Sequence, residues 1–142
     1  MQLEYSVEAD VSPEFAWKFR TDVATWNDPP ATFALEGPFE TGARGTTILP
    51  GQPPIYWRIA DISPGKSFTL EMPLDGAILT FEWSFEALSG RRTRLTQRIV
   101  LSGASEQAYA AQVEAGFGPT LTDGMKRVAA EMTSAGREEK SD

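Results

Sequence analysis

The sequence contains no cysteine and no histidine. Without a thiol or an imidazole, the chain cannot build a Cys-His pair or a Ser-His-Asp triad, and it cannot offer zinc a sulfur or nitrogen ligand. It also cannot form a disulfide bond, yet 142 residues with 41% hydrophobic content suffice for one domain with one core. These absences exclude thiolate and imidazole chemistry from the function of the protein.

A long hydrophobic run and a positive net charge are absent as well. No apolar run approaches the roughly 18 residues of a membrane-spanning helix, and the first residues lack the basic and apolar regions of a secretory signal. We therefore expect a cytoplasmic protein with no membrane span. The formal charge of −7 repels phosphate backbones, so we expect no nucleic-acid partner, although solubility alone also explains such a charge.

The chain also lacks the local patterns of metal and phosphate sites. The acidic residues between Asp22 and Glu40 do not have the spacing of an oxygen-ligand cation site. The glycines between Gly42 and Gly51 are not followed by the lysine-serine pair of a phosphate-binding loop. We expect neither a metal nor a cofactor.

Near the start of the chain, the spacing of apolar residues changes from a period of two to a helical spacing. Residues 3–9 alternate apolar and polar side chains, which predicts a strand. Ser12 is suited to cap a helix, Pro13 suits the first helical position, and Glu14 favours the positive end of the helix. A second short helix is predicted over residues 22–26, so two short helices follow the first strand.

Residues 32–101 carry strand-like segments separated by turns rich in glycine and proline, a pattern typical of an antiparallel meander. The best-defined hairpin pairs residues 79–87 with residues 93–101. Its turn has Gly90 in the second position, although three-residue loops favour glycine in the third. A slip by one residue would bury arginines, which defines the register. The predicted opposite pairs are Glu86 with Arg94, Glu82 with Arg98, Phe85 with Leu95, Phe81 with Ile99, and Trp83 with Gln97.

The last part of the chain, residues 104–135, is helical by composition. Pro119 lacks an amide hydrogen and predicts a kink or a break there. Residues 136–142 are charged and predict a disordered tail, outside the domain that we assign to residues 1–135. One apolar stripe of the helix is expected to face the sheet: Phe117, Leu121, Met125, Val128 and Met132.

Several local motifs accompany this order of elements. They are VSPEFAW at residues 11–17, the segment 22–26 that ends in Trp26, Gly37-Pro38-Phe39 with Gly42 and Gly45, and Trp57 ahead of Ile62-Ser63-Pro64. With them, residues 2–135 resemble the START-like superfamily, also called SRPBCC or the birch-pollen-allergen-like helix-grip fold, which includes polyketide cyclase/dehydrase-type relatives. The resemblance implies an α+β fold in which a curved antiparallel sheet of about seven strands surrounds a long C-terminal helix. Two short helices follow the first strand in this fold, and a cavity holds a hydrophobic ligand.

The residues that would line such a cavity are those on the predicted inner face of the sheet and on the facing helix. Their alternative role is to fill a solid core, because burying a large apolar side chain is itself worth about 1.5–3 kcal/mol. We assign no catalytic residue. The predicted ligand-binding residues are Trp57, Phe68, Leu70, Phe81, Trp83, Phe85, Gln97, Phe117, Leu121 and Met125.

Polar residues within the strands leave two pairs of alternatives open. Gln97 is expected on the inner face, where its amide either bonds to a neighbour such as the indole N–H of Trp83 or orients a ligand. Arg58 and Glu71 are expected to face solvent. A bulge near Asp61 would instead bring them into the pocket as acid/base or carboxylate-binding groups.

Three functions fit these features. The first is binding of a small hydrophobic molecule (a lipid, polyketide or aromatic metabolite) between the sheet and the C-terminal helix, by a monomer or a homodimer. Its mouth would be formed by residues 50–54, residues 73–76 and the region near Pro119. The second is a polyketide cyclase/dehydrase-type enzyme that works without histidine or cysteine. The third is a chaperone-assisting interaction module, which the charged outer face of the sheet favours least.

Overall fold

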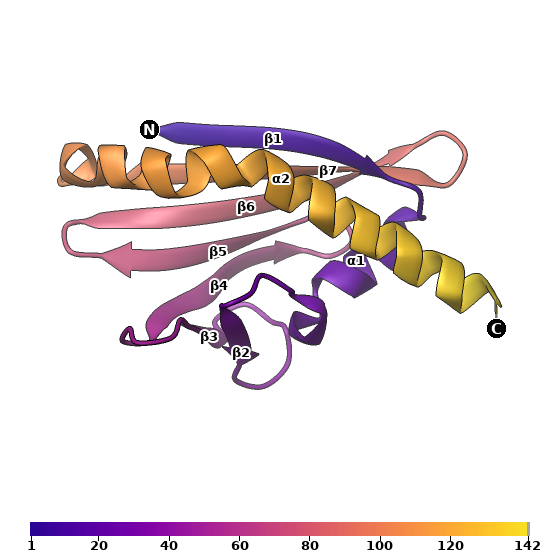
Figure 1. Cartoon of the computed structure of the whole chain (residues 1–142), viewed down its shortest axis with the longest axis horizontal. Helices are drawn as coiled ribbons and strands as arrows, with labels where there is room; N and C mark the ends of the chain where they lie inside the picture. The colour runs from indigo at the N-terminus through magenta and orange to yellow at the C-terminus, as the bar shows by residue number, and fades with distance from the viewer. Residues whose placement is uncertain (142) are drawn as a thin grey trace.

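The structure of the protein, a computed structural model, describes the backbone of residues 1–141 and the side chains of residues 1–138 (Figure 1). Strands dominate the chain up to Ser102, and one long helix follows them. The elements in chain order are β1 (Gln2–Ala9), α1 (Pro13–Arg20), the 3₁₀ helix η1 (Val23–Thr25), β2 (Thr32–Leu35), β3 (Arg44–Ile48), β4 (Ile55–Ser63), β5 (Ser67–Leu74), β6 (Ala77–Leu88), β7 (Arg92–Ser102) and α2 (Glu106–Ser141).

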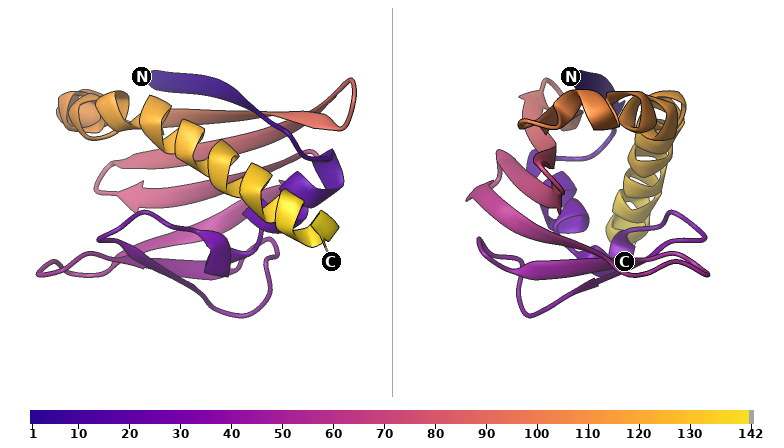
Figure 2. Two further views of the ribbon diagram at one scale, coloured as in Figure 1. Left: turned by 45° about the vertical axis from the view of Figure 1, so that its right-hand side comes forward. Right: turned by 90° about the vertical axis from the view of Figure 1, so that its left-hand side faces the viewer.

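The strands form one antiparallel sheet in the order β1-β7-β6-β5-β4-β3-β2. The segment with α1 and η1 carries the chain from β1 at one edge of the sheet to β2 at the other. The sheet curves, and α2 lies across its concave side against β1 and β7 (Figure 2). The predicted α+β helix-grip architecture is confirmed. The second short helix is a single 3₁₀ turn, where the Asp22 carboxylate accepts a hydrogen bond from Ala24 N at 3.1 Å.

The start of α1 has the predicted cap. Ser12 Oγ accepts a hydrogen bond from Phe15 N at 3.2 Å, and Pro13 is the first helical residue. The chain that enters α1 is held to the sheet by Thr93, a fully buried residue whose hydroxyl donates to the Val11 carbonyl at 2.9 Å. α1 therefore packs against β6 and β7 on the concave side of the sheet.

The β6–β7 hairpin has the predicted register. Every expected pair is observed, including Glu86 opposite Arg94 and Trp83 opposite Gln97. On the outer face the Arg94 guanidinium lies 3.0 Å from the Glu86 carboxylate. Because glycine is second in the turn, the third position falls to Arg91. This residue adopts a φ of 64°, in the left-handed region that glycine favours.

α2 is continuous through Pro119 but changes direction in the part of the helix that holds this proline (Figure 2). Beside it the Thr120 hydroxyl donates to the Gly116 carbonyl at 3.1 Å, a contact that often bends helices. The helix also continues through residues 136–141, in place of the predicted disordered tail, and Asp142 lies outside the described residues. Packing explains the difference, because Gly136 is buried against Val11. None of the helices in residues 1–141 combines the length and the apolar character needed to cross a membrane.

Aromatic rings on the inner face form the centre of the core. Phe68 is 1% exposed. Its ring centroid lies between 5.1 and 6.2 Å from those of Trp17, Phe39, Trp83 and Phe85. The four partner rings come from α1, from the loop before β3 and from β6, so Phe68 joins segments far apart in the sequence.

Trp57 extends this core toward β3. Its indole N–H donates to Thr47 Oγ1 at 3.0 Å, and Trp26 stacks on it with ring centroids 5.5 Å apart. Gly45 lies directly opposite Trp57, and a Cβ atom there would lie 2.2 Å from the indole ring. Only glycine leaves room for the indole to cross β3.

We expect Gly45→Ala to destabilise the protein, because Trp57 and its neighbours must move to admit the methyl group. Overpacking of this kind costs about 1–3 kcal/mol. Urea unfolding followed by tryptophan fluorescence measures the loss. Gly124→Ala, a helical position with nothing within 4 Å of the new Cβ, is the control and should be at least as stable as the unmodified protein. Equal stability of Gly45→Ala and the unmodified protein would contradict this reading of the contact.

Candidate functional site

The structure places the ten predicted ligand-binding residues in or beside the core. Six are buried: Trp57, Phe68, Leu70, Trp83, Phe85 and Met125. The other four are half-buried: Phe81, Gln97, Phe117 and Leu121. The six buried side chains contribute to packing, whereas the other four keep accessible surface.

A row of four neighbouring side chains, two of them polar, crosses the inner face of the sheet at one level. The register places Tyr5 beside Gln97, Gln97 beside Trp83, and Trp83 beside Phe68. Directly opposite residues share one face of a sheet. Tyr5 and Gln97 are half-buried, and their side chains have no hydrogen-bond partner among the described side chains and backbone groups of residues 1–138. The bond between Gln97 and the Trp83 indole, one of the two alternatives, is therefore not formed.

Arg20, the last residue of α1, brings a positive charge to this row. Its Cζ atom lies 4.1 Å from the ring centroid of Trp83 and 4.7 Å from that of Trp26. The Trp26 ring is held in turn by its indole N–H, which donates to the Arg20 carbonyl at 2.8 Å. Each cation–π contact contributes roughly 0.5–2 kcal/mol. The two rings therefore hold the guanidinium against the inner face.

No described carboxylate lies within ion-pair distance of the Arg20 guanidinium. In the described part of the chain its Nε is buried without a hydrogen bond. The two terminal nitrogens have no hydrogen-bond partner in this part of the chain either. Unlike Nε, they are not fully buried and keep some accessible surface. Burial lowers the pKa of Arg20 from its ordinary value to about 9, and the charges of Glu131 and Asp28 oppose this shift. At pH 7 the side chain is therefore charged, although it is largely buried.

Both carboxylates near Arg20 are engaged elsewhere. Asp28 Oδ1 lies 3.0 Å from Arg127 Nη2, and Glu131 Oε1 accepts a hydrogen bond from Asn27 Nδ2 at 3.2 Å. Since Arg127 and Glu131 belong to α2, these contacts also hold the segment after η1 to the helix. Among the described side chains, which end at residue 138, acidic groups nowhere gather in a set of three or more that could hold a metal ion.

Arg58 and Glu71 lie on the outer face, as expected. Arg58 Nη2 lies 2.8 Å from Glu71 Oε2, and the Arg58 side chain is 57% exposed. β4 does contain the anticipated irregularity, between Ile59 and Asp61, but it follows Arg58 in the chain. The bulge therefore does not bring either group into the interior.

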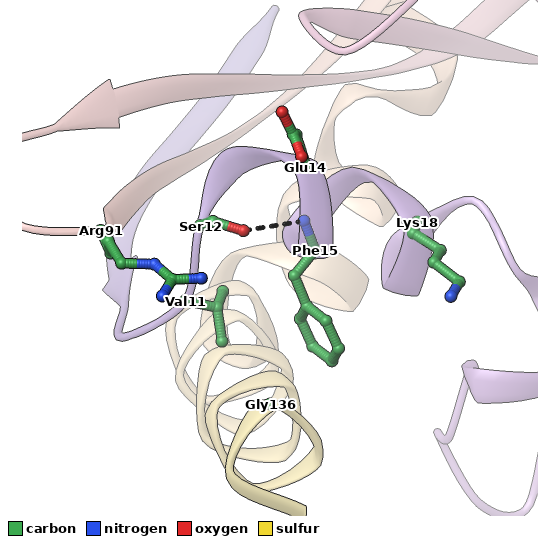
Figure 3. Close-up of a pocket in the computed structure, with 7 residues that line it drawn as sticks. All are labelled: Val11, Ser12, Glu14, Phe15, Lys18, Arg91 and Gly136. Atoms are coloured by element: carbon green, nitrogen blue, oxygen red, sulfur yellow. Dashed lines mark hydrogen bonds between the residues drawn. The ribbon is translucent and has the colours of Figure 1, made fainter. Parts of the chain in front are cut away.

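Two hollows open at the surface beside α2. One, of about 290 Å³, is lined by α1, by the β6–β7 turn and by the end of α2, and its polar residues include Ser12, Lys18 and Arg91 (Figure 3). The Ser12 hydroxyl in it is already engaged as the cap of α1. The other, of about 530 Å³, lies between β1 and α2. None of the ten predicted residues lines either hollow.

The sequence did not predict Arg20 and Trp26 as residues of the site. The available signal for Arg20 was its spacing, since it follows the buried Ala16 by four residues and shares that face of the helix. An arginine in the last turn of a helix is equally well explained by the helix dipole, which hides this signal. Its contact with Trp83 joins segments more than 60 residues apart, so no local pattern predicts it.

Solved structures with this architecture come from distant proteins. Protein NE0264 from Nitrosomonas europaea has a TM-score of 0.72 at 13% identity, with 100% of this chain and 97% of that chain covered. Truncated norcoclaurine synthase from Thalictrum flavum has a TM-score of 0.70 at 12% identity, with coverages of 93% and 92%. The di-domain ARO/CYC BexL from the BE-7585A biosynthetic pathway has a TM-score of 0.73 at 12% identity, with coverages of 92% and 46%. These likenesses define a helix-grip protein.

The sequence itself defines the family. The family described as polyketide cyclase / dehydrase and lipid transport matches residues 1–133. The chain therefore belongs to the polyketide cyclase/dehydrase and lipid transport family, which confirms the resemblance carried by its motifs. No curated protein matches the chain. The family description covers both enzymes and carriers, so the function must be argued from the site.

Proposed function

We propose that the protein binds a small, largely apolar molecule between the inner face of the sheet and α2. Membership of a family described by cyclases, dehydrases and lipid transport supports a hydrophobic ligand. The proposed position is supported by apolar side chains that pack on the core and still keep accessible surface, namely Phe81 on β6 and Leu121 on α2. The ten residues predicted from the sequence remain the proposed lining.

The observation that carries this proposal is the set of unpaired polar groups on the same face. The Gln97 amide and the terminal nitrogens of Arg20 have no partner in the part of the chain whose side chains are described, residues 1–138. Polar groups in protein interiors are almost always hydrogen-bonded. A largely apolar surface with a few convergent polar groups is typical of small-molecule sites. A face that served only as core would gain nothing from these groups.

The neutral apolar dye N-phenyl-1-naphthylamine tests the proposal. We expect its fluorescence to rise on binding and to saturate. Leu121→Gln places an amide on the inner side of α2 and should weaken binding about tenfold, or about 1.4 kcal/mol. Ile78→Gln is the matched control, because Ile78 is 41% exposed, and this change should leave binding as it is.

Two results would contradict the proposal. One is the absence of saturable dye binding by the unmodified protein. The other is an equal effect of the Leu121 and Ile78 substitutions, which would place the dye outside the interior. Native mass spectrometry of the purified protein provides an independent check, since a bound apolar molecule adds a defined mass.

A cyclase or dehydrase activity is the second candidate, favoured by the family description. Such chemistry needs polar groups beside the bound molecule. Of the three residues that the sequence suggested, Gln97 faces the interior, whereas Arg58 and Glu71 are paired on the outer face. Turnover of an aromatic polyketide-type substrate that is unaffected by Gln97→Ala would remove Gln97 from this role. The chaperone-assisting alternative gains no support from an outer face that carries ion pairs such as Arg94–Glu86.

A further inference from the structure

We propose that the ligand is an apolar carboxylic acid whose carboxylate binds the guanidinium of Arg20. The inference rests on the proposed function and adds the chemical class of the ligand. It follows from three features of Arg20: a positive charge with no ion-pair partner among the described side chains, terminal nitrogens that keep some accessible surface, and contact with the aromatic inner face of the sheet.

The positive charge of Arg20 is not neutralised by an ion pair with any described side chain. Charged groups in protein interiors are normally paired, because removing them from water is costly. The two nearest carboxylates do not fill this role, since Asp28 pairs with Arg127 and Glu131 accepts from Asn27. Among the side chains of residues 1–138, no carboxylate lies within ion-pair distance of Arg20. An anionic ligand would supply the missing charge.

The shape of the free group favours a carboxylate. A guanidinium presents its N–H donors in one plane, in a fork that matches the two oxygens of a carboxylate. Trp83 and Trp26 lie within cation–π distance of this group, and its two terminal nitrogens keep some accessible surface for a ligand. The Gln97 amide, beside Trp83 on the sheet, offers a further donor at the same level.

The surroundings of Arg20 favour an apolar body for the rest of the molecule. Phe81 lies two residues from Trp83 on the same face of β6, about 7 Å along the strand. It contacts Phe117 of α2 with ring centroids 5.5 Å apart, and both rings are half-buried. A ligand anchored at Arg20 therefore extends along an aromatic surface toward the first half of α2.

Isothermal titration with 2-naphthoate and 2-naphthamide tests the inference, since the two compounds have nearly the same shape and differ in charge. We expect the unmodified protein to bind naphthoate at least roughly tenfold more tightly, the effect of one charge-assisted hydrogen-bond pair. Arg20→Gln should abolish this preference by weakening naphthoate, with naphthamide affinity changed by less than about threefold. Arg94→Gln is the control, because it removes the same charge from the outer face and should preserve the preference.

Each outcome separates the two proposals. If the neutral dye binds but the protein does not prefer naphthoate, or if Arg20→Gln keeps the preference, the carboxylate inference is wrong and the proposed function stands. If neither the dye nor the naphthyl compounds bind, the proposed function itself is wrong. Should Arg20→Gln fail to fold, the Nε–Hε signal of Arg20 in the ¹⁵N-arginine-labelled unmodified protein decides the matter. It should shift with naphthoate and not with naphthamide, and an unchanged signal would overturn the inference.

Discussion

Phe68→Ala is expected to remove a large part of the stability of this protein. The ring is 1% exposed and contacts four other aromatic rings from three separate parts of the chain. Truncating a buried phenylalanine costs about 3–5 kcal/mol, because the transfer energy is lost and a cavity remains. Whole domains are stable by about 5–15 kcal/mol. Urea unfolding followed by circular dichroism should therefore show a much lower midpoint with a similar slope.

The matched control for this experiment is Tyr56→Ala. Tyr56 is an aromatic residue on the neighbouring strand β4 and is 66% exposed, so its truncation should change the free energy of unfolding by less than about 0.5 kcal/mol. A cost below about 1 kcal/mol for Phe68→Ala would mean that the surroundings of this ring collapse readily. The rings around Phe68 would then not form the rigid wall that the proposed site requires.

Arg20→Met is expected to make the protein more stable at pH 7, by roughly 1–3 kcal/mol. Methionine keeps the apolar stem and removes a charge whose burial is not offset by an ion pair, and such replacements are often stabilising. The loss of the cation–π contacts with Trp26 and Trp83 reduces the gain without cancelling it. Thermal and urea unfolding measure the difference. A clear loss of stability would show that the guanidinium is satisfied within the fold.

The same pair of proteins should show a specific dependence on pH. Burial lowers the pKa of Arg20 to about 9 in the folded state, whereas the unfolded chain keeps the ordinary, much higher pKa of an arginine. Above pH 9 the unfolded state therefore binds more protons at this residue, and the free energy of unfolding rises with pH. The stability advantage of Arg20→Met should be complete below about pH 8 and shrink as the pH rises through 9 toward 10. An advantage that stays constant over this range would contradict the shift.

Together these results would place Arg20 among residues that lower stability where they serve a function. Natural sites often contain groups that the fold alone would not favour. If Arg20→Met gains stability and also loses the preference for naphthoate, the cost of burying the charge is explained by the ligand. If it gains stability and keeps the preference, the charge has no function in binding this class of molecule.

Much of the fold was predictable because its signals are local. The alternation in β6 and β7 placed apolar residues on one face, and only one register keeps the arginines out of the core. Ser12 and Pro13 marked the start of α1 because capping involves residues three apart in the chain. The kink in α2 was expected from Pro119, since the missing amide hydrogen is a property of the residue itself.

The candidate site was predicted less completely. Gln97 was expected on the inner face and lies there, but its possible bond to the Trp83 indole is not formed. Which partners a side chain finds depends on the exact approach of two strands, and the register alone does not determine it. Residues 136–141 are helical because Gly136 packs on Val11, a contact between the two ends of the chain that composition does not reveal.

By itself, the sequence determined the chemistry that is absent, the class of fold and the pairing of the central hairpin, because each follows from residue types and short-range periodicity. Only the tertiary structure decided that a charged residue at the end of α1 would lie on an aromatic inner face without a counterion. That position depends on how α1, β6, the segment after η1 and α2 pack together. Burial and charge there arise from segments distant in sequence, and no short stretch of residues contains that information.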